Sequence, residues 1–312
     1  MAIMALAGCS SAKSGADGDT ADTAFDSRVE RPVFDADSAY GYVQTMVDFG
    51  PRVPNTDAHR KTGDWLEGKL KEFGWTVTPQ TATLKAFDGT RLKARNIFAQ
   101  INPGADDRLL LLAHWDCRPW ADEDSDRSKR SQPVDGANDG ASGVGVLLEI
   151  ARQLGLNPTD KGIDILFVDA EDWGSHDAED SWALGTRYFV ENPPVAGYRP
   201  TQAILLDMVG SPQARFAHEY FSRKSNPGLI DRVWSAASLL GYERYFTNSA
   251  GGAVTDDHVQ LIQHGIPAID IIDYREDMGF DPVWHTSRDD MRNISPQTLG
   301  AVGETLLYVI NN

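Results

Sequence analysis

The stretch IDILFVDAEDWG, residues 163–174, leads from apolar side chains directly into a group of acids. Residues 163–168 are almost continuously apolar, which is typical of a strand that is buried on both faces of a sheet. Asp169, Glu171 and Asp172 then follow within four positions. Carboxylates at the end of a buried strand lose hydration and repel one another, so their placement there costs free energy. The stretch therefore predicts a strand of a buried sheet. It also suggests that the acids at the edge of this sheet have a chemical function.

Similar apolar runs occur elsewhere and alternate with segments that have helical patterns. The runs are LLLLA at 109–113, AILL at 203–206 and IPAIDII at 266–272, and two further strands are expected at 75–83 and 95–101. Helices are expected within 35–50 and 56–75 and at about 142–155, 226–240, 257–264 and 296–310. This order predicts an α/β fold: a single domain with a mostly parallel, twisted central sheet flanked by helices on both faces.

Composition limits the possible functions. The chain has 312 residues, of which 41% are hydrophobic and 24% are charged, and this suits a globular domain with a sizeable core. Its formal net charge of -17 argues against a surface for nucleic acid or for anionic membranes. The two cysteines, Cys9 and Cys117, exclude a disulfide framework and a cysteine zinc site.

The amino-terminal segment resembles the anchoring signal of bacterial lipoproteins. Leu6-Ala7-Gly8-Cys9 has the pattern of a lipobox, and a stretch rich in Ser, Ala, Gly and Asp follows it. We therefore expect residues 1–30 to be a leader remnant and flexible tether, with a lipid anchor at Cys9 and a periplasmic location. The residues before Cys9 are too few for a complete signal, so the native leader is expected to begin upstream. The alternative is an ordinary small-residue terminus with a chance cysteine.

Side chains that can bind a metal or move a proton recur where the predicted strands end. They include His114, Asp172, Asp207 and His285, together with Asp139 and Asp256, which stand just before predicted helices. Ligands of open α/β sheets bind beyond the carboxyl ends of the strands. Oxygen and nitrogen donors without cysteine suit a catalytic zinc, for which three protein ligands leave one position open.

Each of these residues also has an ordinary structural explanation. An aspartate just before a helix is often its N-cap, a lone histidine is usually a hydrogen-bonded loop residue, and acids and tryptophans are common on surfaces and in cores. These explanations apply to Asp139 and Asp256, to His285, to Asp207 and Asp172, and to Trp284 and Trp173. All of them would have to hold at one edge of one sheet, which favours a functional site.

The chain resembles the zinc-dependent glutaminyl-peptide cyclotransferases (glutaminyl cyclases) of the animal and bacterial type, relatives of the co-catalytic zinc aminopeptidases. The resemblance extends over about residues 36–310. It rests on FGPRVPNT (49–56), AHWD (113–116), NDGASGVGVLLEIAR (138–152), FVDAED (167–172), LGTRYF (184–189), LLDMVG (205–210), DDHVQLIQHGIPAIDI (256–271) and VWHTSRDD (283–290). It implies an aminopeptidase-like fold in which residues 31–312 form a zinc-dependent cyclotransferase domain. Its substrates would be peptides or proteins with an N-terminal glutamine, which it would convert to pyroglutamate with release of ammonia.

The resemblance also implies roles for individual residues. One zinc ion per chain would be held by Asp139, Asp172 and His285, with His114 beside the site as an unligated hydrogen-bonding group. Glu171 would be the general acid and base, next to Asp207 and Asp256. Trp284, with Trp173 or Trp182, would line the substrate pocket. Animal cyclases usually have glutamate where this chain has Asp172, serine where it has Gly140, and a disulfide near the position of Cys117, which has no partner here.

Two other functions remain open from the sequence. A zinc aminopeptidase on the same scaffold would use His114, Asp139, Asp172, Asp207 and His285 to hold two metal ions. A non-catalytic lipoprotein would keep the fold as an interaction surface, although the retained ligand positions argue against it. The loop at 117–134 either shapes the pocket entrance or is a solvated insertion. No nucleic-acid partner is expected, and membrane contact is expected only through the anchor at Cys9.

Overall fold

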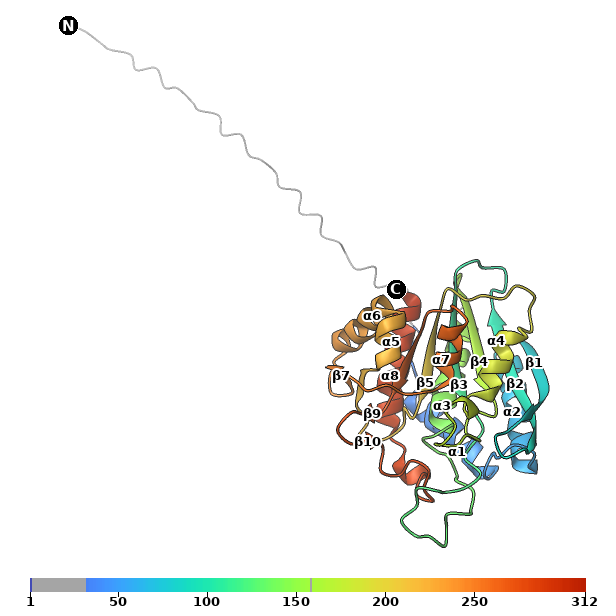
Figure 1. The fold of residues 1–312 in the computed structure, drawn as a ribbon. Helices are drawn as coiled ribbons and strands as arrows, with labels where there is room; N and C mark the ends of the chain where they lie inside the picture. Colours follow the sequence, from blue (N-terminus) through green and yellow to red (C-terminus); the bar gives the residue numbers. More distant parts are fainter. Residues whose placement is uncertain (2–31, 158) are drawn as a thin grey trace. The chain divides into compact units, whose positions relative to one another are not determined.

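The computed structural model describes Met1, residues 32–157 and residues 159–312, and it has a central six-stranded sheet with helices on both faces (Figure 1). The predicted lipobox and tether lie outside the described residues. The strands of the sheet lie in the order β1-β2-β4-β3-β5-β8. Their bounds are β1 Thr76–Lys85, β2 Arg91–Ile101, β3 Arg108–His114, β4 Gly162–Val168, β5 Gln202–Asp207 and β8 Ala268–Ile272.

Four adjacent strands of this sheet run parallel. β4, β3, β5 and β8 pair in parallel, whereas β1 and β2 form an antiparallel hairpin along the edge next to β4. The chain passes from β3 to its neighbour β4 and then across to β5 on the other side of β3, which creates a topological switch point at β3. The predicted α/β fold with a mostly parallel sheet is confirmed.

The helices match the predicted segments closely. Their bounds are α1 Ala36–Asp48, α2 Asp57–Glu72, α3 Ala141–Leu156, α4 Leu184–Glu191, α5 Tyr220–Ser225, α6 Pro227–Leu239, α7 Asp257–Gln263 and α8 Pro296–Asn311. The sequence did not predict the short helices α4 and α5. It also did not predict two small strand pairs, β6 (Phe216–His218) with β7 (Phe246–Ala250) and β9 (Tyr274–Arg275) with β10 (Gly279–Phe280).

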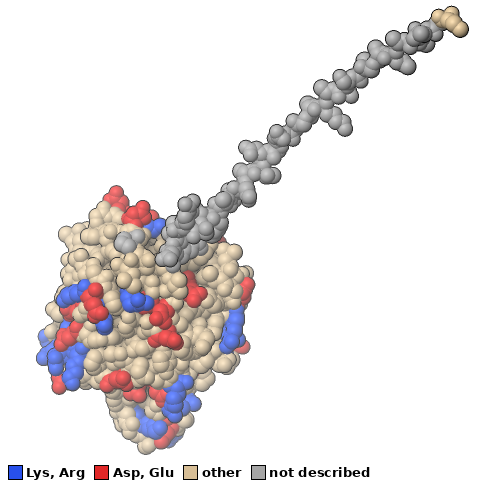
Figure 2. All heavy atoms as spheres, turned by 180° about the vertical axis from the view of Figure 1, so that it is seen from behind, with Lys and Arg blue, Asp and Glu red and all other residues tan. Residues whose placement is uncertain are grey.

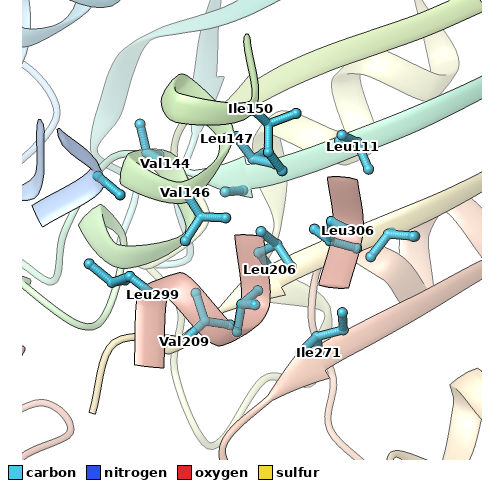
Figure 3. Packing of buried hydrophobic residues seen from close by; sticks show 14 of the residues in the cluster. Leu111, Val144, Val146, Leu147, Ile150, Leu206, Val209, Ile271, Leu299 and Leu306 are labelled. Atoms are coloured by element: carbon cyan, nitrogen blue, oxygen red, sulfur yellow. The ribbon is translucent and has the colours of Figure 1, made fainter. Parts of the chain in front are cut away.

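Alternating side chains of the parallel strands build two cores, one on each face of the sheet. Leu109 and Leu111 of β3 belong to the larger core, which also contains residues of α1, α3, α6 and α8. Leu110 and Leu112 point the other way and pack with residues of α4 and α7. Figure 3 shows the larger core, where side chains of α3 and α8 meet Leu206 of β5 and Ile271 of β8. Because both faces are covered, a site that ligands can reach is expected at the ends of the strands.

Acidic side chains lie both on the surface and in the interior of the protein. Basic and acidic side chains lie next to one another on the face of the molecule shown in Figure 2. Many carboxylates are buried, and several of them, including Asp116, Asp139, Asp172 and Asp289, lie near the carboxyl ends of the parallel strands. Part of the net charge of -17 is therefore internal. Within the described part of the chain, no helix is both long and apolar enough to cross a membrane.

Candidate active site

The side chains that the sequence placed at one edge of the sheet do meet there. His114 and Asp207 are the last residues of β3 and β5, and Asp172 lies four positions beyond the end of β4. Asp139 comes just before α3, and His285 lies in the segment between β10 and α8. Helix α3 has Gly140, the residue after Asp139, as its N-cap. Gly140 has a φ of 94°, and a Cβ added there would clash with the carbonyl oxygen of Asp116. Asp139 is therefore not the N-cap, and its side chain is free for the site.

Three of these residues form a compact group of possible metal ligands. His285 Nε2 lies 3.1 Å from Asp172 Oδ1 and 3.5 Å from Asp139 Oδ2, and one ligand atom of each residue lies within 4.8 Å of the others. All three side chains are buried. Among the described residues, neither carboxylate oxygen of Asp172 has a hydrogen-bond partner, although both are buried. Buried carboxylate oxygens are normally paired, so these two atoms are candidate ligands for a cation.

His114 lies on the other side of Asp139. Its Nε2 lies 3.0 Å from Asp139 Oδ1 and makes a 3.2 Å hydrogen bond with Asp207 Oδ1. His114, Asp139 and Asp207 form a second group whose ligand atoms lie within 4.8 Å of one another. Asp139 belongs to both groups, so the arrangement has donors for one ion beside His285 and for another beside His114.

Burial controls the charge states of this group. Burial lowers the pKa of His285 to about 3, so its imidazole is neutral at pH 7 and has a lone pair available for a metal. Burial raises the pKa of Asp172 to about 7, against the lowering influence of Arg118. A cation bound between these two residues would offset the free-energy cost of a buried carboxylate.

Glu171 combines a buried carboxyl group with access to the cavity beside these donors. Burial raises its pKa well above the ordinary value; the charge of His114 opposes this shift and that of Asp256 adds to it. Burial and Asp207 similarly raise the pKa of Asp256, to about 6. Glu171, Asp207 and Asp256 all line the cavity. Buried carboxyl groups with raised pKa values beside a cavity are candidates for general acid–base catalysis.

Two further buried aspartates hold the backbone of the site. Asp116 accepts hydrogen bonds from the backbone N–H groups of Glu171 and Asp172, each at 3.2 Å. Asp289 accepts them from Asn138 at 2.8 Å and from Asp139 at 3.0 Å. Sequence reasoning assigned no role to either residue. Asp116 stands two positions beyond the end of the buried strand β3, and this position was the signal available for it.

Four residues other than glycine in or beside the site have left-handed backbone conformations. The φ angles are 55° at Ala170, 54° at Ala183, 48° at Met208 and 52° at His285. Ala170 precedes Glu171, Met208 follows Asp207, and Ala183 follows Trp182. Residues other than glycine rarely adopt this backbone conformation, and such backbone strain is typical of functional sites.

The donors open into a cavity of about 260 Å³ with an aromatic wall. Trp284 stacks on His285 with 3.7 Å between ring centroids and on Phe280 with 4.4 Å. Trp182 also lines the cavity, with its ring 6.1 Å from that of His285. The sequence did not point to Phe280, nor to the cavity residues Tyr274 and His176. These residues reach the cavity through the fold of the β9–β10 hairpin and of the segment after Trp173. No local sequence pattern predicts the fold of either segment.

Two sequence predictions need comment. Trp173 does not line the cavity: its indole N–H donates to Asp88 at 3.2 Å, and its ring packs edge-on against Trp120 at 5.6 Å. The side chain of Asp256 caps α7 by accepting the N–H of Asp257, which confirms the structural explanation, and it also lines the cavity.

Comparison with known proteins places this site in a family. The sequence pattern of peptidase family M28 matches residues 96–310. The chain belongs to peptidase family M28. Its structure resembles that of a glutaminyl cyclase from Porphyromonas gingivalis, with a TM-score of 0.88 and 52% sequence identity over 90% of this chain and 99% of the other. A Zn-dependent exopeptidase from Parabacteroides distasonis matches equally well, with the same four values. A glutaminyl-peptide cyclotransferase-like protein from Bos taurus is 27% identical over 80% of this chain and 68% of its own length.

These similarities confirm the predicted relationship to the glutaminyl cyclases and to zinc peptidases. They also agree with the chemistry of the donor group. One neutral imidazole and two carboxylates, one of them with unpartnered buried oxygens, form the set of nitrogen and oxygen ligands that a catalytic zinc site uses. Asp139, Asp172 and His285 therefore fit a zinc ion.

Proposed function

We propose that this protein is a glutaminyl-peptide cyclotransferase that converts the N-terminal glutamine of peptides or proteins to pyroglutamate and releases ammonia. One observation carries the proposal: the buried carboxyl group of Glu171 and the aromatic wall formed by Trp284 face one cavity beside the donors Asp139, Asp172 and His285. The similarity to a glutaminyl cyclase over nearly its whole length supports it.

One zinc ion per chain would be held by Asp139, Asp172 and His285. It would supply Lewis-acid polarisation of the side-chain amide of the substrate. The hydrogen bond between His114 and Asp207 supports a single ion, because it gives His114 a partner other than a metal. In this assignment His114 stays beside the ion and keeps Asp207 in place.

The residues of the chain would perform the proton transfers. The α-amine of the glutamine attacks its own side-chain amide carbon, so a carbon–nitrogen bond forms and a five-membered lactam closes. Glu171 accepts the proton that the amine loses and returns it to the amide nitrogen, which leaves as ammonia. Asp207 and Asp256, which line the same cavity, share protons with Glu171 as one coupled acid group. The stacked rings of Trp284 and Phe280 would exclude water from the attacking amine.

A pair of peptides tests this proposal directly. The purified protein is given one peptide with N-terminal glutamine and one with N-terminal leucine. We expect ammonia release and a blocked amino terminus from the first, with every peptide bond intact, and no cleavage of the second. About one zinc ion should be found per chain by metal analysis.

An aminopeptidase is the second candidate, and a specific observation favours it. His114, Asp139 and Asp207 form a second group of donors that shares Asp139 with the first, as a two-metal site requires. The neighbour from Parabacteroides distasonis carries the name of an exopeptidase. Release of free leucine by a protein with two tightly bound zinc ions would replace the cyclase proposal and make His114 and Asp207 metal ligands.

We also propose that the protein is anchored in the periplasm through a lipid on Cys9. The support is the LAGC sequence at 6–9 and the polar stretch that follows it. In the full-length gene, Cys9→Ser should move the protein from the membrane fraction to the soluble fraction. An unmodified protein that is already soluble and unlipidated would contradict this location.

A further inference from the structure

The loop at 117–134 contacts two segments that carry proposed metal ligands. One follows β4 and carries Asp172, and the other follows β10 and carries His285. The sequence allowed it to be a pocket entrance or a solvated insertion. In the structure its first part, from Arg118 to Asp124, is largely withdrawn from solvent, whereas residues 125–128 are exposed. The buried part makes the contacts described next.

Arg118 binds the segment that carries Asp172. Its side chain is only 2% exposed, and Nη1 donates hydrogen bonds to the backbone oxygens of Asp172 and Gly174, each at 3.0 Å. The guanidinium carbon Cζ also lies 4.8 Å from the ring centroid of Trp182 and 5.1 Å from that of Trp120. This fork of donors is therefore held in one orientation.

The same guanidinium holds Asp122 against the second ligand. Nε and Nη2 of Arg118 donate to the two carboxylate oxygens of Asp122 at 3.0 and 2.6 Å. Asp122 Oδ1 lies 3.6 Å from His285 Nδ1, which is buried and has no hydrogen-bond partner among the described residues. The other nitrogen of this ring, Nε2, faces Asp139 and Asp172. One side of the imidazole thus faces the ligands and the other faces the loop.

The loop also fixes the backbone that carries His285. The N–H of Glu123 donates to the carbonyl oxygen of His285 at 3.1 Å. Asp124 Oδ2 accepts hydrogen bonds from the backbone N–H of Ser287 at 2.9 Å and from its hydroxyl at 2.6 Å. These contacts hold the chain at His285 itself, where φ is 52°. They give the strained conformation the external support that it needs.

We propose that residues 117–124 are a clasp that positions two zinc ligands, with Asp122 orienting the imidazole of His285 and Arg118 fixing the segment of Asp172. This inference rests on the proposed zinc site. Histidines that bind a metal through one ring nitrogen usually donate the N–H of the other to a carboxylate or carbonyl, and loss of that partner lowers metal affinity. Asp122 and Arg118 are positioning residues, since they act on the substrate only through His285 and Asp172.

Zinc affinity of the chelator-treated protein tests the clasp. Asp122→Asn keeps the size of the side chain and removes its charge, and we expect zinc to bind roughly 10–100-fold more weakly in competition with a chromogenic chelator. Arg118→Lys keeps the positive charge but not the planar fork, and a weakening in the same direction is expected. The matched control is Asp126→Asn, in the exposed part of the same loop, where the carboxylate accepts hydrogen bonds from Ser128. Its zinc affinity should equal that of the unmodified protein.

Melting temperatures separate positioning from simple structural support. Without zinc, Asp122→Asn should melt below Asp126→Asn, because the buried guanidinium of Arg118 loses its counter-ion, and zinc should raise the melting temperature less in Asp122→Asn. Equal zinc affinities in the two variants would overturn the clasp and leave the proposed function intact. A zinc-free melting temperature lowered in Asp122→Asn with unchanged zinc affinity would also overturn it. An unmodified protein that binds no zinc would overturn both proposals.

Discussion

Buried carboxylates lie near both ends of strand β4, and they differ in the hydrogen bonds and counter-ions that compensate their negative charge. At the start of the strand, Asp164 is fully buried and fully paired. It accepts hydrogen bonds from the guanidinium of Arg108, from the amide of Gln100 at 3.1 Å and from the hydroxyl of Tyr198 at 2.8 Å. A buried carboxylate with a counter-ion and satisfied oxygens needs no further ligand, and its removal would leave the counter-ion uncompensated.

Beyond the end of the strand, the oxygens of Asp172 accept no hydrogen bond from the described residues, and the guanidinium of Arg118 lies only at the outer limit of ion-pair distance. Arg118 Nη1 lies 3.7 Å from Asp172 Oδ1 and donates instead to backbone oxygens. The same fold can therefore satisfy a carboxylate on one strand end and leave another unsatisfied. This difference indicates a structural role for Asp164 and supports the proposal that Asp172 is a zinc ligand.

The largest effect is expected for Asp172→Ala. Removal of one of three proposed ligands should abolish zinc binding and reduce turnover to background. The zinc-free protein should be no less stable than before, because the removed carboxylate was buried and unpaired. Metal analysis, ammonia release and melting temperature measure the three effects. Retention of zinc in this variant would show that Asp172 is not a ligand.

Glu171→Gln separates proton transfer from metal binding. The amide has nearly the same shape but cannot accept the proton, so turnover should fall roughly 10²–10⁴-fold while the zinc content stays normal. Steady-state kinetics and metal analysis of the same preparation give both values. A zinc content as low as that of Asp172→Ala would reassign Glu171 as a ligand, and unchanged turnover would remove it from the mechanism.

Asp164→Asn tests the opposite end of β4. The variant leaves the buried guanidinium of Arg108 without its counter-ion, and the free energy of unfolding should fall by about 3–5 kcal/mol. Turnover per folded molecule should not change. Urea unfolding measures the loss, and the exposed Asp106 provides the control, since Asp106→Asn should change stability by no more than about 0.5 kcal/mol. A loss of turnover with unchanged stability would contradict the structural role given to Asp164 and its contrast with Asp172.

The smallest effect is expected at Glu219, a second fully paired carboxylate. Burial alone would raise its pKa, but hydrogen bonds from His258 and from the N–H of Ser222 lower it to about 2. Because the folded pKa lies below the ordinary value, the stabilisation is present above about pH 4.5 and is lost as the pH falls toward 2. It amounts to about 3 kcal/mol. The free energy of unfolding should therefore fall more steeply over this range in the unmodified protein than in Glu219→Gln, and parallel curves would contradict this.

The strands and most of the site could be predicted because their signals are local. An uninterrupted apolar run such as LLLLA predicts a buried strand, and the acids and histidines that follow such runs must meet at one edge. The roles of Asp116 and Asp289 could not be predicted, because these carboxylates act on backbone N–H groups that come from other segments. The same limit explains Trp173, whose partner Asp88 lies in the β1–β2 turn.

The clasp illustrates the limit further. Nothing in the residues of 117–134 indicates that Glu123 meets the carbonyl oxygen of His285, since the two lie far apart in the chain and the contact needs only a backbone N–H. The aromatic wall had a partial signal: Trp284 adjoins His285 and was predicted, whereas Phe280 depends on the hairpin that brings it against Trp284.

The order of the segments along the chain has a consequence for biosynthesis. A ribosome delivers a protein from its amino end, so Asp139 and Asp172 emerge well before His285. The strand β8 and the helix α8, which belong to the sheet and the larger core, also follow Asp172 in the chain. A partly translated chain therefore exposes both an unfinished apolar face and a set of unpartnered acids. Binding of the proposed zinc ion must therefore wait until the chain has been made as far as His285.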